Sequence, residues 1–413
     1  MRWVFLFVVL GLWTTACNQR QSGDLQDKML TVRMLAENKK VIPLLFSYGE
    51  LKVTNVKLPD MLVTNDSQEP WAMTTVEVVG KHEAQSVVRY VLDQEVLAKA
   101  AKADAEQLNK EIAKPGHMQR RIGKVVYRGP FSAGTALGRG ESGAIMLSSL
   151  LFVEYAGPQQ LTSLEVVVGG ERAGKPTRNV LPIELTAYKL KGDYVFPLAK
   201  RDLLVANLPM NLTQHREMRS QEFAMDIAGI GKDMRGTMNV FGSDPAKLSD
   251  YFGYGRPVLA VDDGTVARVG TAFEDSMTGD PTKYSEDFFK KLMADLVPKI
   301  GLTNAVCGNY IVIDHGNGEY SAYAHLKEGS ITKKSGDKVK RGEAIAKLGN
   351  TGHSTAPHLH FQLMDGTDFF TSNGLPVTFS NVKVQEMNSN LAESNALLFS
   401  DFLVMDDPPA KPN

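Results

Sequence analysis

The segment Pro357–Phe361 is the feature of this chain that most constrains its fold. It reads Pro-His-Leu-His-Phe and follows a glycine-rich run. In an extended strand, side chains at positions i and i+2 lie on one face, so His358 and His360 project together while the apolar residues next to them face a core. Neutral imidazole binds Zn²⁺ well and titrates near neutral pH. The pattern therefore indicates a strand that can serve a metal-dependent hydrolase.

Short blocks punctuated by glycine surround this segment. The blocks are Gly255–Ala260, Asp263–Val266, Gly308–Ile313, His315–Gly318, Tyr323–Leu326, Gly336–Val339 and Gly349–Gly352. In order and wording they resemble the lysostaphin-type (LytM-like) zinc metallopeptidases, which cut peptide cross-bridges in bacterial peptidoglycan. The resemblance implies an antiparallel β peptidase domain over residues 203–385, one zinc ion per chain and peptidoglycan peptide stems as the substrate.

The resemblance also implies roles for individual residues. In the family, a His and an Asp spaced as HxxxD and the second histidine of HxH hold the metal, whereas two further motif histidines act on water and substrate. Here His360 matches the HxH ligand, and His325 and His358 match the catalytic histidines. The implied aspartate is Asp226, since the alternating segment Phe223–Ile227 is typical of a strand that turns this carboxylate away from the core.

The first histidine of the HxxxD motif is absent, because position 222 holds Glu222. Three interpretations remain open. His215 could reach the metal if the segment between it and Asp226 loops out. Glu222 could itself be the ligand, because it shares an alternating face with Asp226 and carboxylates bind zinc; or the site has no third ligand and the domain is catalytically dead. We predict His215, Asp226 and His360 as the ligand set.

These residues predict a zinc-dependent endopeptidase that hydrolyses the peptide cross-links of peptidoglycan. Zinc supplies a Lewis acid and an activated water. His325 and His358 would transfer protons, a contribution typically worth about 10²–10⁴ in rate. The alternative is a catalytically degenerate domain that binds peptidoglycan or regulates other wall hydrolases.

The N-terminus predicts export. A basic residue precedes an apolar run that ends at Trp13 and is too short for a comfortable membrane span, so residues 1–16 are interpreted as a signal peptide. Cys17 follows a small residue and resembles the bacterial lipobox cysteine, which implies a lipid anchor in a membrane followed by a polar tether over residues 17–27. Because Asn18 stands where Asp commonly signals the inner membrane, the resemblance implies an outer-membrane lipoprotein that faces the periplasm.

The composition argues against a nucleic-acid partner. The 46 basic and 47 acidic side chains leave a formal net charge of −1, which provides no electrostatic basis for binding nucleic acid or an anionic surface. Cys307 is the only thiol besides Cys17, so the exported chain has no internal disulfide framework. A length of 413 residues suits two or more domains.

Residues 28–202 are predicted to form a β-rich accessory domain. Short runs rich in Val, Leu, Ile and Thr are bounded by turn residues and favour a β-sandwich. The runs are Leu51–Val56, Thr74–Val79, Gly123–Tyr127, Ala144–Tyr155, Leu164–Val168 and Ile183–Tyr188. Gln94–Ile112 lacks Gly and Pro, and it predicts an exposed helix or helical hairpin.

The peptidase domain is predicted to carry a helical insertion. Residues 273–303 interrupt the family blocks, and Ser285–Leu296 within them has helical spacing. His315 lies in a turn sequence between two apolar runs, which favours a structural role in a hairpin. Residues 386–413 are predicted to be a C-terminal tail. The whole chain is therefore expected to be mainly β, with a sandwich-like N-terminal domain before the peptidase domain.

Overall fold

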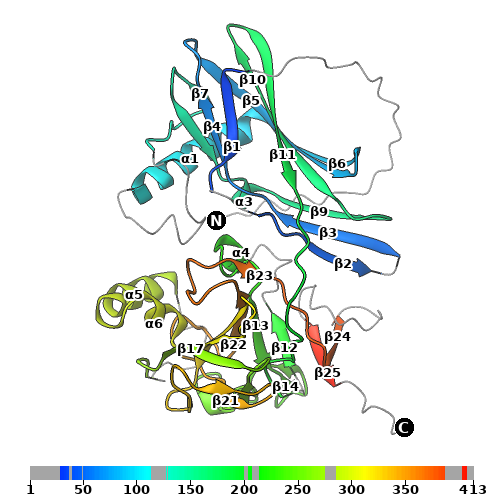
Figure 1. Cartoon of the computed structure of the whole chain (residues 1–413). Helices are drawn as coiled ribbons and strands as arrows, with labels where there is room; N and C mark the ends of the chain where they lie inside the picture. Colours follow the sequence, from blue (N-terminus) through cyan, green and yellow to red (C-terminus); the bar gives the residue numbers. More distant parts are fainter. Residues whose placement is uncertain are drawn as a thin grey trace.

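A computed structural model describes residues 28–36, 40–48, 50–112, 127, 129–199, 203–206, 214–274, 285–386 and 402–406. Over these ranges the chain is mainly β and forms two lobes connected by an extended segment (Figure 1). Each pair of named strands is antiparallel. These observations confirm the predicted fold class. The predicted signal peptide and Cys17 lie outside the described residues.

The N-terminal domain contains three antiparallel sheets and one long helix. The sheets have the strand orders β1-β4-β8, β11-β10-β5-β6 and β2-β3-β9, and β7 pairs with β5. The elements are β1 (Leu30–Met34), β2 (Leu44–Tyr48), β3 (Leu51–Lys57), β4 (Met61–Asn65), β5 (Trp71–His82), β6 (Gln85–Leu92), α1 (Gln94–Ile112), β7 (Ala136–Leu137), β8 (Ser142–Ile145), α3 (Leu147–Leu150), β9 (Phe152–Gly157), β10 (Ser163–Arg172) and β11 (Lys175–Glu184).

All three sheets contribute to one hydrophobic core. Trp71, Val76 and Val78 of β5 are buried in this core, and Leu164 and Val166 of β10 reach it from the neighbouring strand. The other two sheets add Val56, Met61, Val63, Ile145 and Val153. Burial of one face of each strand against a shared core explains why short strands with a period of two form a sandwich-like unit.

Helix α1 confirms the predicted helix but corrects its predicted exposure. Leu97, Ala101, Ala105 and Leu108 are each at most 2% exposed and form a stripe at helical spacing that packs on the domain. Half of the stripe is alanine, so the sequence of the helix appears polar although one face is covered. The run Ala144–Tyr155 is likewise not one strand, because α3 separates β8 from β9; residues 123–126 lie outside the described residues.

The C-terminal domain is built on one large sheet. Its strand order is β20-β17-β18-β19-β22-β13-β12-β25-β24, with β23 paired to β22. The elements are β12 (Leu203–Ala206), α4 (Gln214–Glu217), β13 (Met225–Gly229), β14 (Gly231–Lys232), β15 (Met238–Asn239), the 3-10 helix Leu248–Asp250, β16 (Pro257–Leu259), β17 (Gly264–Gly270), α5 (Glu286–Ile300), α6 (Leu302–Cys307), β18 (Asn309–Asp314), β19 (Tyr320–Leu326), β20 (Lys338–Val339), β21 (Ala344–Lys347), β22 (Leu359–Met364), β23 (Gly374–Leu375), β24 (Val382–Glu386) and β25 (Phe402–Asp406).

This sheet has an apolar cluster on each face. Ile311 and Ile313 of β18 belong to the larger cluster, and Val312 between them belongs to the smaller one. On β22, Leu359 and Phe361 enter the larger cluster. Because side chains alternate along a strand, the even-numbered residues of β22 are left on the face of the smaller cluster. That face carries the predicted site.

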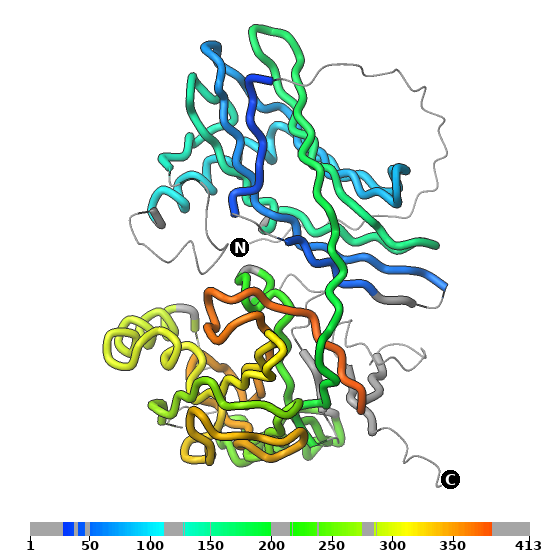
Figure 2. The backbone as a smooth tube through the Cα atoms, in the orientation of Figure 1, coloured from blue at the N-terminus to red at the C-terminus, as the bar shows by residue number. Residues whose placement is uncertain are grey.

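The connection between the domains is fixed to the C-terminal domain by a buried carboxylate. The chain after β11 runs from the upper to the lower lobe (Figure 2). Glu319, which is 0% exposed, accepts hydrogen bonds of 2.5 Å from the hydroxyls of Tyr188 and Tyr194. It also accepts the backbone N–H groups of Lys191 at 3.0 Å and Gly192 at 3.1 Å. The connecting segment is therefore anchored at the hairpin between β18 and β19.

The elements near the predicted domain boundaries belong to the C-terminal sheet and its core. Tyr194, Phe196 and Leu198 precede residue 202, yet they pack in the larger cluster of this domain. Strand β25 lies within the range predicted as a tail, and it pairs with β12 and β24. Both ends of the domain thus extend beyond the segment that carries the family blocks.

The predicted insertion, residues 273–303, contains helix α5 and the first residues of α6. Helix α5 begins after Ser285, whose side chain accepts a first-turn backbone N–H at 3.1 Å and acts as an N-cap. The helix predicted over Ser285–Leu296 is therefore confirmed. Phe289 of α5 stacks on His353 with ring centroids 3.9 Å apart, and the backbone N–H of His353 donates to Val306 at 2.8 Å. The insertion thus packs on the loop that leads into β22.

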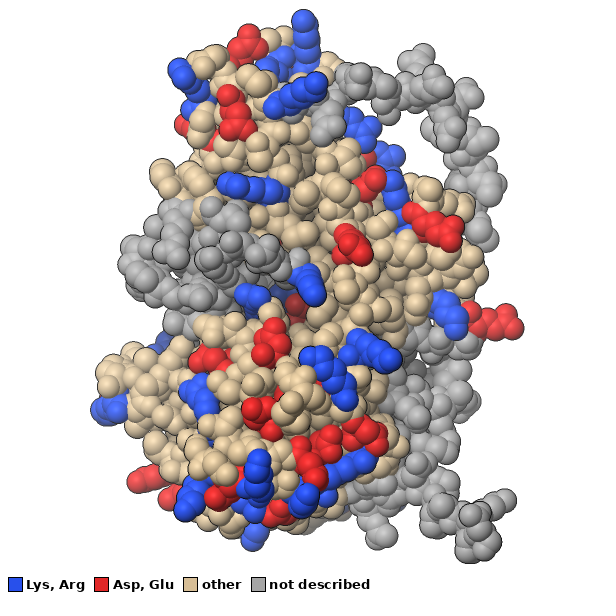
Figure 3. Space-filling view, in the orientation of Figure 1, with Lys and Arg blue, Asp and Glu red and all other residues tan. Residues whose placement is uncertain are grey.

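The described surface shows no single dominant sign of charge on the face seen in Figure 3, where acidic and basic side chains are interspersed. This distribution agrees with the balanced charge of the sequence. Among the described residues, no helix has the length and apolar character needed to cross a membrane.

Candidate metal centre and catalytic histidines

Strand pairing brings Asp226 and His360 together. In β13, Met225 and Ile227 are buried in the larger cluster, so Asp226 lies on the other face of the sheet. The β13–β22 register places Asp226 directly opposite His360. Directly opposed residues of antiparallel strands point to the same side. Asp226 is 9% exposed and His360 is 4% exposed, so the pair lies in a largely buried setting.

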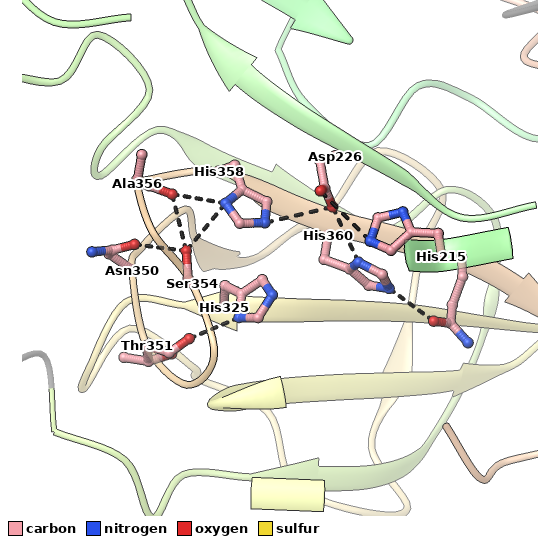
Figure 4. A network of polar contacts seen from close by, with 10 residues as sticks. His215, Asp226, His325, Asn350, Thr351, Ser354, Ala356, His358 and His360 are labelled. Atoms are coloured by element: carbon pink, nitrogen blue, oxygen red, sulfur yellow. Dashed lines mark hydrogen bonds and ion pairs between the residues drawn. The ribbon is translucent and has the colours of Figure 1, made fainter. Parts of the chain in front are cut away.

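His215 of α4 completes a group of three potential ligands (Figure 4). Its Nε2 lies 3.6 Å from Asp226 Oδ2, and His360 Nδ1 lies 3.1 Å from Asp226 Oδ1. The three ligand atoms all lie within 4.8 Å of one another. Zinc–ligand bonds of about 2.0–2.2 Å would place neighbouring ligand atoms of a tetrahedron about 3.4 Å apart, so this set of two nitrogens and one oxygen fits a zinc ion. The structure thus brings all three predicted ligands together.

Gln362 sets the orientation of the His360 ring. Its Oε1 lies 2.8 Å from His360 Nε2, and its own Nε2 donates to the Ser220 carbonyl at 3.2 Å. The amide is therefore held with its oxygen toward the imidazole, and it favours the tautomer with the proton on Nε2. That tautomer leaves a lone pair on Nδ1, which points to the space beside Asp226.

Glu222 lies outside this group. It belongs to the turn that precedes β13, so the predicted strand face shared with Asp226 is wrong. The Glu222 side chain is 8% exposed and lines a separate cavity of about 330 Å³, together with Lys40, Tyr188 and Arg219. The strand begins only at Met225 because the preceding residues make the turn that follows α4.

His325 reaches the site through an irregularity in β19. The β18–β19 register pairs Asn309 with Leu326 and Ile311 with Tyr323, so β19 holds one more residue than β18 over this stretch. His325 has φ of 59°, in the left-handed region that few non-glycine residues adopt. A bulge of this kind re-aims a side chain. The His325 ring centroid lies 4.7 Å from that of His358 and 5.9 Å from that of His360.

Backbone carbonyls orient both predicted catalytic rings. His325 Nδ1 lies 2.7 Å from the Thr351 carbonyl, and His358 Nδ1 lies 2.7 Å from the Ala356 carbonyl. A carbonyl accepts only, so each Nδ1 must carry a proton, and the lone pair of the neutral ring is then on Nε2. His358 Nε2 lies 3.5 Å from Asp226 Oδ1 and therefore faces the same space as the three potential ligands (Figure 4).

Burial and the neighbouring imidazoles determine the charge states of Asp226 and His325. Burial opposes ionisation of Asp226, but the neighbouring His215, His358 and His360 outweigh it and hold the pKa of Asp226 well below its usual range. Burial, together with His358 and His360, holds the pKa of His325 well below its usual range. At neutral pH the site therefore presents an ionised carboxylate beside a neutral His325 that can accept a proton.

Several residues that build the site were not predicted from the sequence. Gln362 follows His358 and His360 at the same spacing of two, so strand periodicity could have placed it on their face. Ser354 contacts His358 Nδ1 at 3.2 Å, and Thr351 binds His325 through its carbonyl. Both lie in the glycine-punctuated loop before β22, where no periodic signal identifies a partner.

His315 lies outside this site. It contacts Asp263, Ser321 and Tyr194, as a structural residue of the hairpin.

Comparisons with known proteins match part of the C-terminal domain. Residues 294–377 match the model described as Peptidase family M23. A stretch of 57 residues is 51% identical to the peptidoglycan DD-endopeptidase ShyA of Vibrio cholerae serotype O1, covering 14% of this chain and 13% of that protein. Another match is 34% identical over 120 residues to the glycyl-glycine endopeptidase ALE-1 of Staphylococcus capitis, covering 27% of this chain and 32% of that protein.

Among solved structures, the catalytic domain of lysostaphin from Staphylococcus simulans is similar over 33% of this chain and 85% of that one, with 25% identity and a TM-score of 0.19. The chain spans at most about a third of the length of the curated relatives named above, namely 13% and 32%. The family match includes β18, β19 and β22, whereas His215 and Asp226 precede it. Residues 294–377, which include His325, His358 and His360, therefore belong to a Peptidase family M23 domain.

Proposed function

We propose that the chain is a zinc-dependent endopeptidase that hydrolyses peptide cross-links of bacterial peptidoglycan. The observation that carries the proposal is the group of His215, Asp226 and His360, whose ligand atoms lie within 4.8 Å of one another beside two further imidazoles. Relatives named as peptidoglycan endopeptidases supply the substrate class.

The three proposed ligands would hold one zinc ion through His215 Nε2, an Asp226 oxygen and His360 Nδ1. A set of three protein ligands, rather than four, suits a catalytic rather than a structural zinc site. When bound, zinc supplies a Lewis acid that polarises the scissile carbonyl and favours deprotonation of water. Gln362 and the Ser220 carbonyl keep the His360 ring in the tautomer that this role requires.

His325 and His358 are the proposed proton carriers. Each holds its Nδ1–H on a backbone carbonyl and presents an unprotonated Nε2 toward the site. Either Nε2 can take the proton of the attacking water, and the imidazolium formed in this way can deliver the same proton to the leaving amine of the cleaved peptide. The fixed carbonyl acceptors keep both rings oriented before substrate arrives, so little reorganisation is needed during the reaction.

We also propose that the chain is exported and anchored in the outer membrane by a lipid on Cys17. The support is the apolar segment of residues 1–16, the cysteine that follows it and the wall-directed relatives. A lipidated N-terminus followed by the tether of residues 17–27 would hold the peptidase domain on the periplasmic side, within reach of the wall. A Cys17→Ala variant found still attached to membranes would argue against this anchor.

The alternative is a degenerate domain that binds peptidoglycan or regulates other wall hydrolases. Its premise was the missing histidine of the HxxxD motif. The position of His215 beside Asp226 and His360 supports the proposal of an active enzyme over this alternative.

The test combines metal analysis with digestion of purified sacculi by the mature chain. We expect one zinc per chain and release of cleaved peptides. His360→Ala should lose both zinc and activity, because it removes a ligand. His325→Ala and His358→Ala should each keep zinc but slow turnover by about 10²–10⁴-fold, because only proton transfer is removed. Bound zinc without any digestion would favour the degenerate alternative, and stoichiometric zinc in His360→Ala would reject the ligand set.

A further inference from the structure

The residue that follows the proposed ligand His215 is buried against the other domain. Arg216 is 2% exposed. Its Nη2 donates to Asn55 Oδ1 at 3.3 Å, and its guanidinium carbon lies 4.9 Å from the centroid of the Phe152 ring. Asn55 belongs to β3 and Phe152 belongs to β9, which are strands of the N-terminal domain.

The N-terminal residues that contact Arg216 lie on one face of the β2-β3-β9 sheet. The β3–β9 register pairs Asn55 with Glu154 and Lys57 with Phe152, so all four side chains lie on the same face of this sheet. Asn55 is 1% exposed and Lys57 is 3% exposed, although both are polar. The planar guanidinium of Arg216 can donate to the amide and stack on the aromatic ring at once.

Helix α4 cannot determine the position of His215 by itself. It has four residues, about one turn, and a single turn is unstable without tertiary contacts. On its C-terminal side, the Met218 backbone N–H donates to the His215 carbonyl at 3.0 Å, and the Met218 side chain packs on the smaller cluster of the C-terminal domain. On the other side, Arg216 reaches into the N-terminal domain. The helix that carries the ligand is thus held from both domains.

We propose that Arg216 is a positioning residue through which the N-terminal domain holds His215 at the metal site. The inference rests on the proposed zinc site and adds a role for the N-terminal domain, whose surface at Asn55 and Phe152 then sets the geometry of a ligand in the other domain. A change in this surface would alter metal affinity although none of its residues approaches the metal.

The test uses the full mature chain and substitutions in the N-terminal domain. Asn55→Leu removes the amide oxygen that accepts from Arg216, whereas Asn55→Asp keeps an oxygen acceptor at the same place. Arg216→Met removes the guanidinium itself. Two quantities are measured: the zinc dissociation constant by competition with a chromophoric chelator, and the side-chain NMR signals of His215 in metal-free protein, assigned with a His215→Gln variant.

We expect Asn55→Leu and Arg216→Met to weaken zinc binding by about 10–100-fold, the range typical when the support of a metal ligand is lost. Both should also shift the His215 signals, and Asn55→Asp should remain close to the unsubstituted chain. The matched control is Arg268→Met in the C-terminal domain, because Arg268 also contacts an aromatic ring, Tyr310 at 5.8 Å, and a carbonyl, Thr367 at 3.1 Å. It should leave zinc affinity unchanged.

Unchanged zinc affinity and unchanged His215 signals in both Asn55→Leu and Arg216→Met would overturn the inference, and a loss of thermal stability alone would assign Arg216 to domain packing only. If the unsubstituted chain binds no zinc, the proposed enzyme fails, but the metal-free His215 signals still decide whether the N-terminal surface positions this ring.

Discussion

At the residue scale, the site depends on where three imidazoles keep their protons. His325 and His358 each give an N–H to a backbone carbonyl, and His360 gives one to the Gln362 amide oxygen. A backbone carbonyl and a well-held amide do not change charge with pH, unlike a carboxylate. The lone pairs of all three rings are therefore presented to the site by neutral partners, with Asp226 as the anion at its centre.

Gln362 is expected to control metal affinity through His360. In Gln362→Met the Nε2–H of His360 loses its acceptor, so the ring can rotate or change tautomer, and zinc should bind about 10–100-fold more weakly. Gln362→Glu keeps an acceptor oxygen and should remain closer to the unsubstituted chain. Chelator competition measures both constants. Equal zinc affinity in the Met variant and the unsubstituted chain would show that strand packing alone orients His360.

His315 is expected to contribute to the pH dependence of stability. Burial lowers its pKa, and both ring nitrogens have partners in the fold, the Asp263 carbonyl at 2.9 Å and Ser321 Oγ at 2.8 Å. In the unfolded chain the His315 side chain has a pKa of about 6.5, so it binds a proton more readily there than in the folded chain. The contribution of His315 is therefore present above pH 6.5 or so and declines as the pH falls toward its folded-state pKa.

The comparison is made in metal-free protein, with the free energy of unfolding measured in urea at pH 7.5 and pH 5.5. His315→Gln should lose less stability between the two values than the unsubstituted chain, because it cannot be protonated. An identical loss in both proteins would mean that His315 is not the titrating group.

At the scale of secondary-structure elements, the bulge in β19 is held by a polar cluster. Thr351 Oγ1 accepts the backbone N–H of Asn309 at 2.9 Å and donates to the Leu326 carbonyl at 2.8 Å. The approach is close, since a Cβ on Gly308 would lie 2.4 Å from Thr351 backbone carbon, and Gly308 has φ of 62°. Strand β18, the bulge beside His325 and the loop before β22 are thus joined at one threonine.

Replacing Thr351 with Val should destabilise this junction. The buried Asn309 N–H would lose its acceptor, which costs about 1–3 kcal/mol. Turnover should fall as well. Loss of the Oγ1 contacts loosens the segment whose Thr351 carbonyl holds the His325 ring. Thr351→Ser keeps the hydroxyl and serves as the control. Urea unfolding and sacculus digestion measure the two effects, and a Val variant as stable and active as the Ser variant would contradict the role.

At the scale of the whole molecule, the two domains have separate hydrophobic cores. Leu164 is fully buried in the core of the N-terminal domain, and Leu363 is fully buried in the larger cluster of the C-terminal domain. The described contacts between the domains include the hydrogen bond from Arg216 to Asn55. They also include the connecting segment, which Glu319 holds through the Tyr188 hydroxyl. Chains built in this way commonly unfold in more than one step.

Leu164→Ala and Leu363→Ala should therefore lower different thermal transitions. Each substitution leaves a cavity in a packed core and should cost about 2–5 kcal/mol. Differential scanning calorimetry of the mature chain distinguishes the two transitions, and only the Leu363 variant should lower the one that zinc stabilises. If both variants shift one shared transition equally, the domains fold as a single cooperative unit.

Local periodicity accounts for what the sequence determined by itself. The alternation around Asp226 and His360 predicted which face each would take, because side-chain direction along a strand depends only on neighbouring residues. The helix Ser285–Leu296 was predicted from helical spacing and Gln94–Ile112 from its lack of Gly and Pro, and both of these signals are also local. The sandwich-like N-terminal domain was predicted from short runs between turn residues, whereas the antiparallel β peptidase domain was implied by the family resemblance.

The remaining features were decided by contacts between residues far apart in the chain. His215 lies beside Asp226 through tertiary contacts of α4, and His325 turns to the site where β19 contains a bulge relative to β18. The covered face of α1 depends likewise on the sheets that pack against it. Strand register, bulges and domain contacts depend on non-local pairing, which a pattern of neighbouring residues does not encode. Tertiary structure therefore decided the position of the proposed third ligand and the orientation of the proposed catalytic rings.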